Sequence, residues 1–249
     1  MYSVDIPEII GTIGEETFYG CKNLSAISIK NISSIGDYAF ANCSNLTTVE
    51  LSDNITMIGV NPFRNCVNIT AFEGKYASTD GRCLIVNNKL IACITKGLTE
   101  YTLPNGIRET GAYVLIGTDL KSLTIPDDVI YIRNYSFYGS ELVRVDIGDN
   151  VLEIGEHAFC NNLSLKEVFI GVKVATIGYG AFYSNALSYV YCKPHNPPSI
   201  YNNPFNNFGS HENYTIFVPS AAYEQYKQAD GWRDFASKIR GYSGPLIEP

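Results

Sequence analysis

Phenylalanine recurs along the chain at a nearly constant interval, and this interval limits the fold more than any other feature. Phe18, Phe40 and Phe63 stand 22 and 23 residues apart. The same step separates a second set further along the chain, which consists of Phe137, Phe159, Phe182 and Phe205. Self-similarity at such a period is typical of repeat architectures, in which each repeat covers the apolar core of its neighbour. The sequence therefore predicts a solenoid.

An isoleucine stands five residues before most of these phenylalanines, and a glycine commonly follows it. The motif reads Ile-Gly-x-x-x-Phe, as at Ile35-Gly36 and Ile154-Gly155. Glycine at a repeated position serves either a positive φ or a close approach to the next coil. Both explanations are compatible with the sequence.

A short alternating run follows the phenylalanine in each repeat. Examples are Leu46-x-x-Val49-x-Leu51 and Leu142-x-x-Val145-x-Ile147. Alternation with a period of two predicts a strand with one buried face. One strand in each repeat of about 22 to 23 residues predicts a leucine-rich-repeat solenoid, a mainly β or α/β right-handed superhelix.

A small polar residue stands three positions after each phenylalanine or its equivalent. These residues are Cys21, Cys43, Cys66, Thr118, Ser140, Asn162 and Asn185. We expect their short side chains to satisfy buried backbone groups where the coil turns into the strand. Because Thr, Ser and Asn share this position with Cys, its cysteines are interpreted as structural thiols. The remaining cysteines show no Cys-x-x-Cys spacing and receive the same interpretation, so no metal site and no cofactor are expected.

The repeats are interrupted once, where the step from Phe63 to Leu115 widens to 52 residues. Two apolar runs at 83–86 and 89–92 flank Asn87-Asn88, which predicts a β-hairpin on a two-residue turn. We expect one leucine-rich-repeat domain over 1–249. Its predicted parts are N-terminal repeats that open within a repeat (1–75), the hairpin insertion (76–97), central repeats (98–200), and a last coil, strand and C-terminal cap helix (201–249).

The predicted cap helix begins near Ser220, whose side chain is a suitable N-cap. Tyr223 and Tyr226 follow at helical spacing, and Trp232 and Phe235 extend the apolar face. This helix is expected to close the end of the core.

Two motifs carry a resemblance to a known family. Ile-Gly-x-x-Ala-Phe occurs at 35–40, 154–159 and 177–182, and Cys-x-Asn-Leu occurs at 21–24 and 43–46. In this combination the chain resembles, over almost its whole length, the BspA-like leucine-rich repeats of surface and secreted proteins of Bacteroides and related bacteria. The resemblance implies a cell-surface or secreted protein that mediates adhesion by binding protein or glycan, and it implies no catalytic residues.

The sequence departs from the family pattern at three positions. Arg133 replaces the motif glycine, and Thr110 and Leu115 replace the isoleucine and the phenylalanine. The first residues also lack the charged and apolar regions of a signal peptide, so the surface location is an expectation from the resemblance alone.

The outward face of the strands is the expected binding surface. Residues on either side of the central valine point out of the sheet and form two columns. At the C-terminal end these columns contain Arg144, Asp146, Glu167, Phe169, Tyr189 and Tyr191. Aromatic residues combined with arginine are typical of binding hot spots. The alternative is that the three aromatic residues pack beneath the segment 202–212.

Composition and spacing exclude several other functions. The formal net charge is -7 and no basic run follows the chain, so nucleic acid is not an expected partner. No apolar run has the length of a membrane helix, so no membrane insertion is expected. His157, His195 and His211 show no spacing typical of a zinc site or a nucleophile and base pair, which favours a non-enzymatic protein.

Two functions are compatible with these observations. The first is recognition of a protein or glycan ligand, for which host extracellular matrix and mucin are candidates. The alternative is an architectural spacer or stalk in a larger surface protein, with no binding role of its own.

Overall fold

The structure is a computed structural model that describes residues 2–4, 6–7, 9–117, 119–183, 186–205 and 213–244. Its contacts divide the chain into two compact units, each of which is considered by itself. Unit 1 comprises residues 1–98 and 106–119, and unit 2 comprises residues 99–105 and 120–249. The fold is a mainly β solenoid with repeats of about 22 residues, which confirms the architecture predicted from the phenylalanine spacing.

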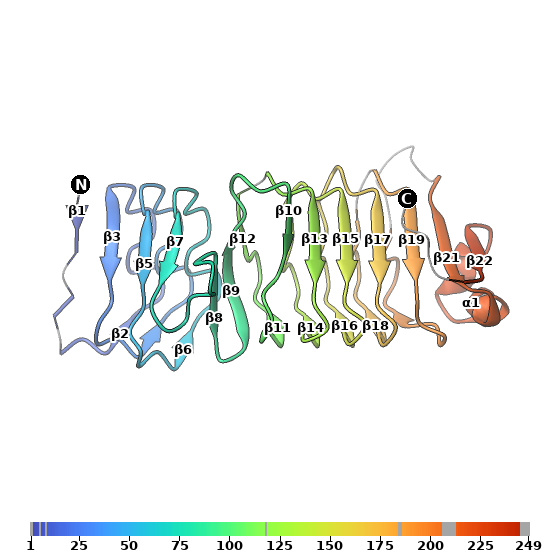
Figure 1. The fold of residues 1–249 in the computed structure, drawn as a ribbon, viewed down its shortest axis with the longest axis horizontal. Helices are drawn as coiled ribbons and strands as arrows, with labels where there is room; N and C mark the ends of the chain where they lie inside the picture. The colour runs from blue at the N-terminus through green and yellow to red at the C-terminus, as the bar shows by residue number, and fades with distance from the viewer. Residues whose placement is uncertain are drawn as a thin grey trace. The chain divides into compact units, whose positions relative to one another are not determined.

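Unit 2 contains a parallel sheet of seven strands, and the arrows of its central strands run side by side in the same direction in Figure 1. In spatial order the strands are β10 (Glu100–Thr102), β13 (Ser122–Ile125), β15 (Arg144–Ile147), β17 (Glu167–Ile170), β19 (Tyr189–Cys192), β21 (Thr215–Pro219) and β22 (Ile239–Tyr242). Val145, Val168 and Val190 are Cα partners in successive strands and are fully buried. The predicted period-two alternation therefore places the valine inside.

Short strands on the return side of each coil form a second parallel ladder in unit 2. They are β14 (Tyr131–Ile132), β16 (Glu153–Ile154), β18 (Thr176–Ile177) and β20 (Ser199–Ile200). Their isoleucines are the isoleucines of the repeat motif. Ile154 and Ile177 are Cα partners and fully buried, so both sides of the coil contribute to one core.

Unit 1 repeats this arrangement with fewer coils. Its first sheet contains β1 (Tyr2–Ser3), β3 (Leu24–Ser28), β5 (Thr48–Glu50) and β7 (Ala71–Glu73), and its return ladder contains β2 (Thr12–Ile13), β4 (Ser34–Ile35) and β6 (Met57–Ile58). The predicted hairpin is present as β8 (Cys83–Val86) and β9 (Lys89–Ile94), which pair antiparallel. Strand β9 also pairs in parallel with β11 (Glu109–Thr110) and β12 (Leu115–Ile116).

The repeated phenylalanines form stacks inside each unit. Phe159 and Phe182 are fully buried, and their ring centres lie 5.3 Å apart with the ring planes inclined by 7°. In unit 1, Phe18 and Phe40 stack at 5.2 Å with the same inclination. An interval of 22 to 23 residues thus advances the chain by one coil and brings like side chains into contact.

The motif glycine is required by close approach between coils. A Cβ atom on Gly178 would lie 2.6 Å from the amide nitrogen of Glu156 in the preceding coil, and one on Gly155 would lie 2.6 Å from that of Asn134. Neither glycine has a positive φ. Of the two explanations compatible with the sequence, the structure selects close approach at these positions.

In most of the described repeats, the small polar residue after the phenylalanine binds backbone groups, as predicted, whereas Cys21 is exposed. Asn162 donates to the carbonyl oxygens of Phe137 and Phe159 at 2.8 Å, and its own oxygen accepts the amide of Ser140 at 3.1 Å. Cys43 donates from its thiol to the carbonyl of Phe18 at 3.1 Å. Thr118 and Asn185, for which the same role was predicted, lie outside the described residues.

The C-terminal cap consists of η1 (Ser220–Ala222), α1 (Tyr223–Gln228) and η2 (Trp232–Phe235). Tyr226, Trp232 and Phe235 are buried against the end of the core, which confirms the predicted helical cap. The prediction that Ser220 caps the helix is wrong. The residue at the N-cap of α1 is Ala222, because a turn of 3-10 helix intervenes, and the Ser220 hydroxyl instead accepts a hydrogen bond from Ser243 at 2.9 Å.

Candidate functional site

The predicted outward columns are in register across the sheet of unit 2. Glu167 is the Cα partner of Arg144 on one side and of Tyr189 on the other. Phe169 is likewise the partner of Asp146 and of Tyr191. All six predicted site residues therefore lie on three adjacent strands, β15, β17 and β19.

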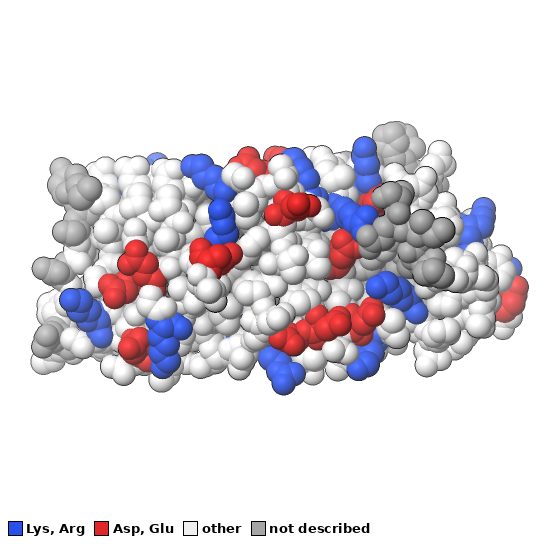
Figure 2. Space-filling model, viewed as in Figure 1, with Lys and Arg blue, Asp and Glu red and all other residues white. Residues whose placement is uncertain are grey.

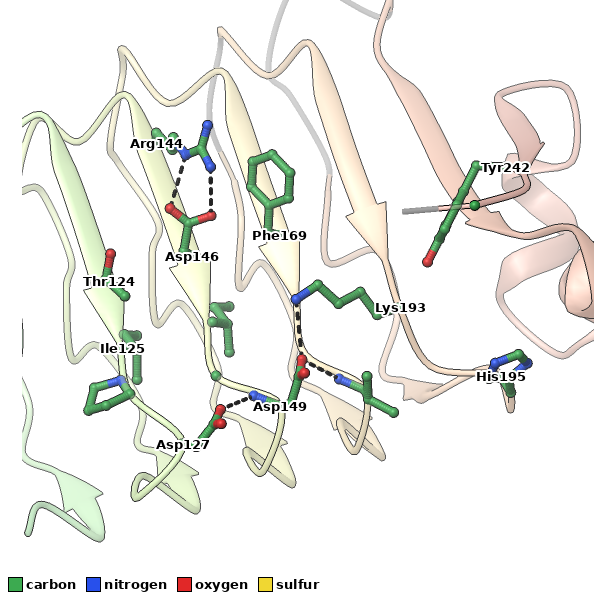
Figure 3. Close-up of a pocket in the computed structure, with 15 residues that line it drawn as sticks. Thr124, Ile125, Asp127, Arg144, Asp146, Asp149, Phe169, Lys193, His195 and Tyr242 are labelled. Carbon is green, nitrogen blue, oxygen red and sulfur yellow. Dashed lines mark hydrogen bonds and ion pairs between the residues drawn. The ribbon is translucent and has the colours of Figure 1, made fainter. Parts of the chain in front are cut away.

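On β15, Arg144 contacts several of the other predicted site residues. Its Nε and Nη2 atoms donate to the two carboxylate oxygens of Asp146 at 2.9 and 3.1 Å, and its Nη1 atom lies 3.8 Å from Glu167. The guanidinium carbon also lies 4.3 Å from the centre of the Phe169 ring. A planar guanidinium suits both interactions, because it binds a carboxylate with two nitrogens and stacks on an aromatic face. Figure 3 shows Arg144, Asp146 and Phe169 together on the sheet.

The aromatic residues continue from Arg144 as a stacked row. The Phe169 and Tyr191 ring centres lie 4.5 Å apart with the planes inclined by 10°, and Tyr191 and Phe217 follow at 5.1 Å and 11°. We call Arg144, Phe169, Tyr191 and Phe217 the stacked row. Because its planes are almost parallel, each ring face inside the row is covered by its neighbour. Phe169 is consequently buried, with 4% of its surface exposed, although its position in the strand points outward.

Tyr189 differs from the stacked row in its exposure. Its ring is inclined by 40° to Tyr191 and by 38° to Phe217, and 43% of its surface is exposed. Of the three predicted aromatic residues, Tyr189 is therefore the one that offers most of its surface to a partner. The alternative prediction, that the segment 202–212 covers these aromatics, falls largely on residues 206–212, which lie outside the described residues.

Local charge and burial hold the Tyr191 hydroxyl in its protonated form. Burial is the largest cause that raises the pKa of Tyr191, followed by the nearby Glu167, while Arg144 acts in the opposite direction. Tyr191 therefore presents a neutral hydroxyl that can both donate and accept a hydrogen bond.

A groove of about 820 Å³ lies beside the stacked row, across the carboxyl ends of β13, β15 and β17. Thr124 and Asp127 line it from the first of these coils, and Lys193, His195 and Tyr242 line it from the C-terminal side. In Figure 3, Tyr242 projects toward the groove from β22, and His195 lies at its far end. Burial and the nearby Cys192 and Asp149 raise the pKa of Tyr242.

Two aspartates that line this groove each accept a hydrogen bond from a backbone amide of the next coil. Asp127 accepts the amide of Asp149 at 2.6 Å, and Asp149 accepts the amide of Val172 at 3.3 Å. Lys193 forms an ion pair with Asp149 at 3.2 Å. On the face shown in Figure 2, acidic side chains form a continuous row just beyond the carboxyl ends of β13 to β17, bordered by basic side chains.

Sequence reasoning missed several residues of this surface. Phe217 could have been found, because β21 was predicted as a strand and its alternation places Phe217 in register with Tyr191. Tyr242 carried no such signal, since β22 was not predicted. Lys193 and Asp149 come after the ends of β19 and β15, where the alternation of the strand no longer predicts which way a side chain points.

The two histidines among the described residues, His157 and His195, lie in different surroundings. His157 packs between the rings of Tyr135 and Tyr179, at 5.2 and 5.1 Å, and His195 lines the groove. His211 lies outside the described residues. Within the described ranges, no group of three or more His, Cys, Asp or Glu side chains is arranged to hold a metal ion. In the same part of the chain, no helix is long and apolar enough to cross a membrane.

Comparison with known proteins identifies the repeat. The model of the BspA type leucine rich repeat region matches residues 1–80 and 87–216 in six copies. A search of curated proteins finds no match.

Two solved structures share the fold. A leucine rich cell surface protein from Faecalibacterium prausnitzii is 19% identical, with a TM-score of 0.67, and the match covers 98% of this chain and 63% of that one. The pneumococcal vaccine antigen PcpA is 20% identical, with a TM-score of 0.65, over 99% of this chain and 68% of the antigen. The chain thus spans less than two thirds of the Faecalibacterium protein.

Proposed function

The chain belongs to the family of proteins with BspA-type leucine-rich repeats, and from this premise we propose that it is a secreted or cell-surface recognition protein that binds a protein or glycan. The similar Faecalibacterium protein, which is described as a cell surface protein, supports the location. The binding surface in this proposal is the outward face of β15, β17 and β19 together with the adjoining groove.

The stacked row is the observation that carries the proposal. Its side chains are held by ring stacking and by the two hydrogen bonds from Arg144 to Asp146, so they lose little conformational freedom when a partner binds. Tyr189 stands beside the row with 43% of its surface exposed. A rigid aromatic surface with one exposed tyrosine is typical of a recognition hot spot.

The polar groups around the row favour a partner that donates hydrogen bonds. Asp127, Asp146 and Asp149 line the groove. Arg144 pairs with Asp146 and Lys193 with Asp149, and each carboxylate has further lone pairs that can accept hydrogen bonds. Amide and ammonium groups of a protein, or the hydroxyls of a glycan, can donate to such carboxylates. An aromatic ring beside them contacts apolar groups of the same ligand.

Binding to extracellular-matrix proteins and to mucin glycans, measured with the purified chain, tests this function. Tyr189→Ala is expected to weaken binding at least tenfold, or about 1.4 kcal/mol, if Tyr189 is a hot-spot contact. Tyr179→Ala is the matched control, because Tyr179 is the same residue type with 41% of its surface exposed and lies next to β18. It should bind as the unmodified chain does.

Two outcomes argue against the proposal. Equal binding by both variants, at unchanged unfolding midpoints, would place the binding site elsewhere. Failure of the folded chain to bind any of these ligands would favour the architectural spacer.

A further inference from the structure

Cys83 and Cys93 face each other across the hairpin of unit 1. The two residues are Cα partners in the antiparallel pair β8 and β9, and their Sγ atoms lie 2.7 Å apart. The remaining interval of the hairpin, from Val86 to Lys89, contains the two-residue turn. The cysteines therefore stand opposite each other at the open end of the hairpin, away from the turn.

The backbone groups of Cys83 and Cys93 bind other residues and not one another in the hydrogen bonds described here. The amide of Cys83 donates to the Ser78 hydroxyl, and its carbonyl accepts the Ser78 amide, both at 2.8 Å. The amide of Cys93 donates to the carbonyl of Val114. Such a non-hydrogen-bonded antiparallel pair brings its Cα atoms to about 4.5 Å. That separation lies within the range of about 4.4 to 6.8 Å that a disulfide spans.

Two of the other cysteines of unit 1, Cys43 and Cys66, bind backbone carbonyls. The thiols of Cys43 and Cys66 each donate to a phenylalanine carbonyl of the preceding coil at 3.1 Å. They occupy the small polar position of the repeat. In unit 2, the side chains of Ser140 and Asn162 at this position likewise donate to a phenylalanine carbonyl. Cys83 and Cys93 lie outside this repeated position, so the repeat does not account for them.

We propose that Cys83 and Cys93 form a disulfide when the chain folds in an oxidising compartment. The thiolate of one cysteine attacks the disulfide of a thiol–disulfide exchange partner, which forms a mixed disulfide and releases one partner thiolate. The second cysteine, as its thiolate, then attacks the sulfur of the first and releases the other partner thiolate. The chain loses two electrons and two protons, and the partner's disulfide is reduced to two thiols.

Burial of the two thiols determines at which step of folding this reaction can occur. Both cysteines are 0% exposed in the folded unit. Burial is also the largest cause that raises the pKa of Cys93 well above its ordinary value, so the folded thiol is protonated and unreactive. Oxidation therefore belongs to the stage before β8 and β9 close, and the finished disulfide is shielded from reductants.

The cross-link has a structural consequence for the hairpin. Its register shifts at a bulge between Leu84 and Ile85, next to the cysteine pair. A hairpin with a bulge can slip between alternative registers, and a slip of one residue moves each side chain to the opposite face. A covalent bond between Cys83 and Cys93 would fix the observed pairing of β8 with β9 between the bulge and the open end of the hairpin.

Counting thiols tests the proposal independently of any binding function. The chain is refolded in a mixture of reduced and oxidised glutathione, and the fraction with native circular dichroism is denatured and alkylated with iodoacetamide without reductant. Of the seven cysteines, five should be alkylated before reduction and all seven after it. Trypsin cleaves after Arg82, Lys89 and Lys96, so the disulfide should join the separate peptides 83–89 and 90–96.

Two variants serve as controls. Cys43→Ser combined with Cys66→Ser should keep the linked peptides, whereas Cys83→Ser should leave every remaining cysteine open to alkylation. Seven alkylated cysteines in the folded, unreduced chain would overturn the proposal. A glutathione adduct in place of the linked peptides, or a link between Cys43 and Cys66, would do the same.

Discussion

The guanidinium carbon of Arg144 lies 4.3 Å from the centre of the Phe169 ring while two of its nitrogens donate to the carboxylate of Asp146. The Arg144 side chain thus pairs with an acid at the surface and also covers one face of the Phe169 ring. Phe169 owes its burial to this cover on one side and to Tyr191 on the other.

Replacing Arg144 should therefore destabilise the chain. Arg144→Met removes the charge that compensates Asp146 and Glu167 and the cation that stacks on Phe169, so the free energy of unfolding should fall by about 1 to 2 kcal/mol. Arg144→Lys keeps the charge but cannot bind the carboxylate with two nitrogens, and an intermediate loss is expected. Urea unfolding measures both, and a methionine variant as stable as the parent would contradict the role assigned to Arg144.

The buried phenylalanine stack should be more sensitive than the surface row. Phe182 is fully buried between Phe159 and Phe205, with ring centres at 5.3 and 5.8 Å. Phe182→Ala opens a cavity in the core and should lower the free energy of unfolding by about 3 to 5 kcal/mol. Phe182→Leu keeps most of the volume, so a smaller loss is expected, and equal losses in the two variants would show that side-chain volume is not what matters there.

Periodicity predicted the core because a solenoid converts sequence interval directly into spatial contact. Residues 22 or 23 apart become neighbours. Residues at the same position of the repeat, such as Cys43 and Asn162, therefore take the same role in different coils. The same rule placed Tyr191 beside Phe169. It did not predict the burial of Phe169, because alternation gives the side of the sheet and not the packing between neighbours on that side.

The Cys83 and Cys93 pair shows a second limit of sequence reasoning. Counting outward from the Asn87-Asn88 turn in a regular hairpin pairs Cys83 with Ala92. The bulge between Leu84 and Ile85 advances the pairing by one residue and places Cys93 opposite Cys83. Bulges arise from tertiary packing as much as from local sequence, so the pairing could be recognised only in the structure.

The close approach at the motif glycine can be tested with a single methyl group. Gly178→Ala would place its Cβ atom 2.6 Å from the Glu156 amide, and the coils must separate to admit it. Overpacking of this kind should lower the free energy of unfolding by about 1 to 3 kcal/mol. Gly11→Ala is the control, since no atom lies within 4 Å of its added Cβ, and its stability should stay close to that of the parent. A tolerated Gly178→Ala would mean that the coils separate at little cost.

Alkaline unfolding should report on the buried tyrosine of the C-terminal cap. Tyr226 is fully buried, and its hydroxyl donates to the carbonyl of Pro194 at 2.9 Å. Burial, followed by the nearby Cys192 and Tyr242, raises the pKa of Tyr226 above that of an unfolded tyrosine. The folded state therefore holds this proton more tightly. The resulting stabilisation is complete below about pH 10 and is lost at about 1.4 kcal/mol per pH unit above it.

Tyr226→Phe isolates this effect, because phenylalanine keeps the ring but has no proton to lose. At pH 7 the variant should be less stable by about 1 kcal/mol, since the hydrogen bond to Pro194 is absent. Above pH 10 the parent alone continues to lose stability through Tyr226, so the difference between the two proteins should close by about pH 11. Taking the difference cancels the titration of the other buried tyrosines and cysteines, which both proteins share. A difference that stays constant from pH 7 to pH 11 would show that Tyr226 ionises alike in the folded and unfolded chain.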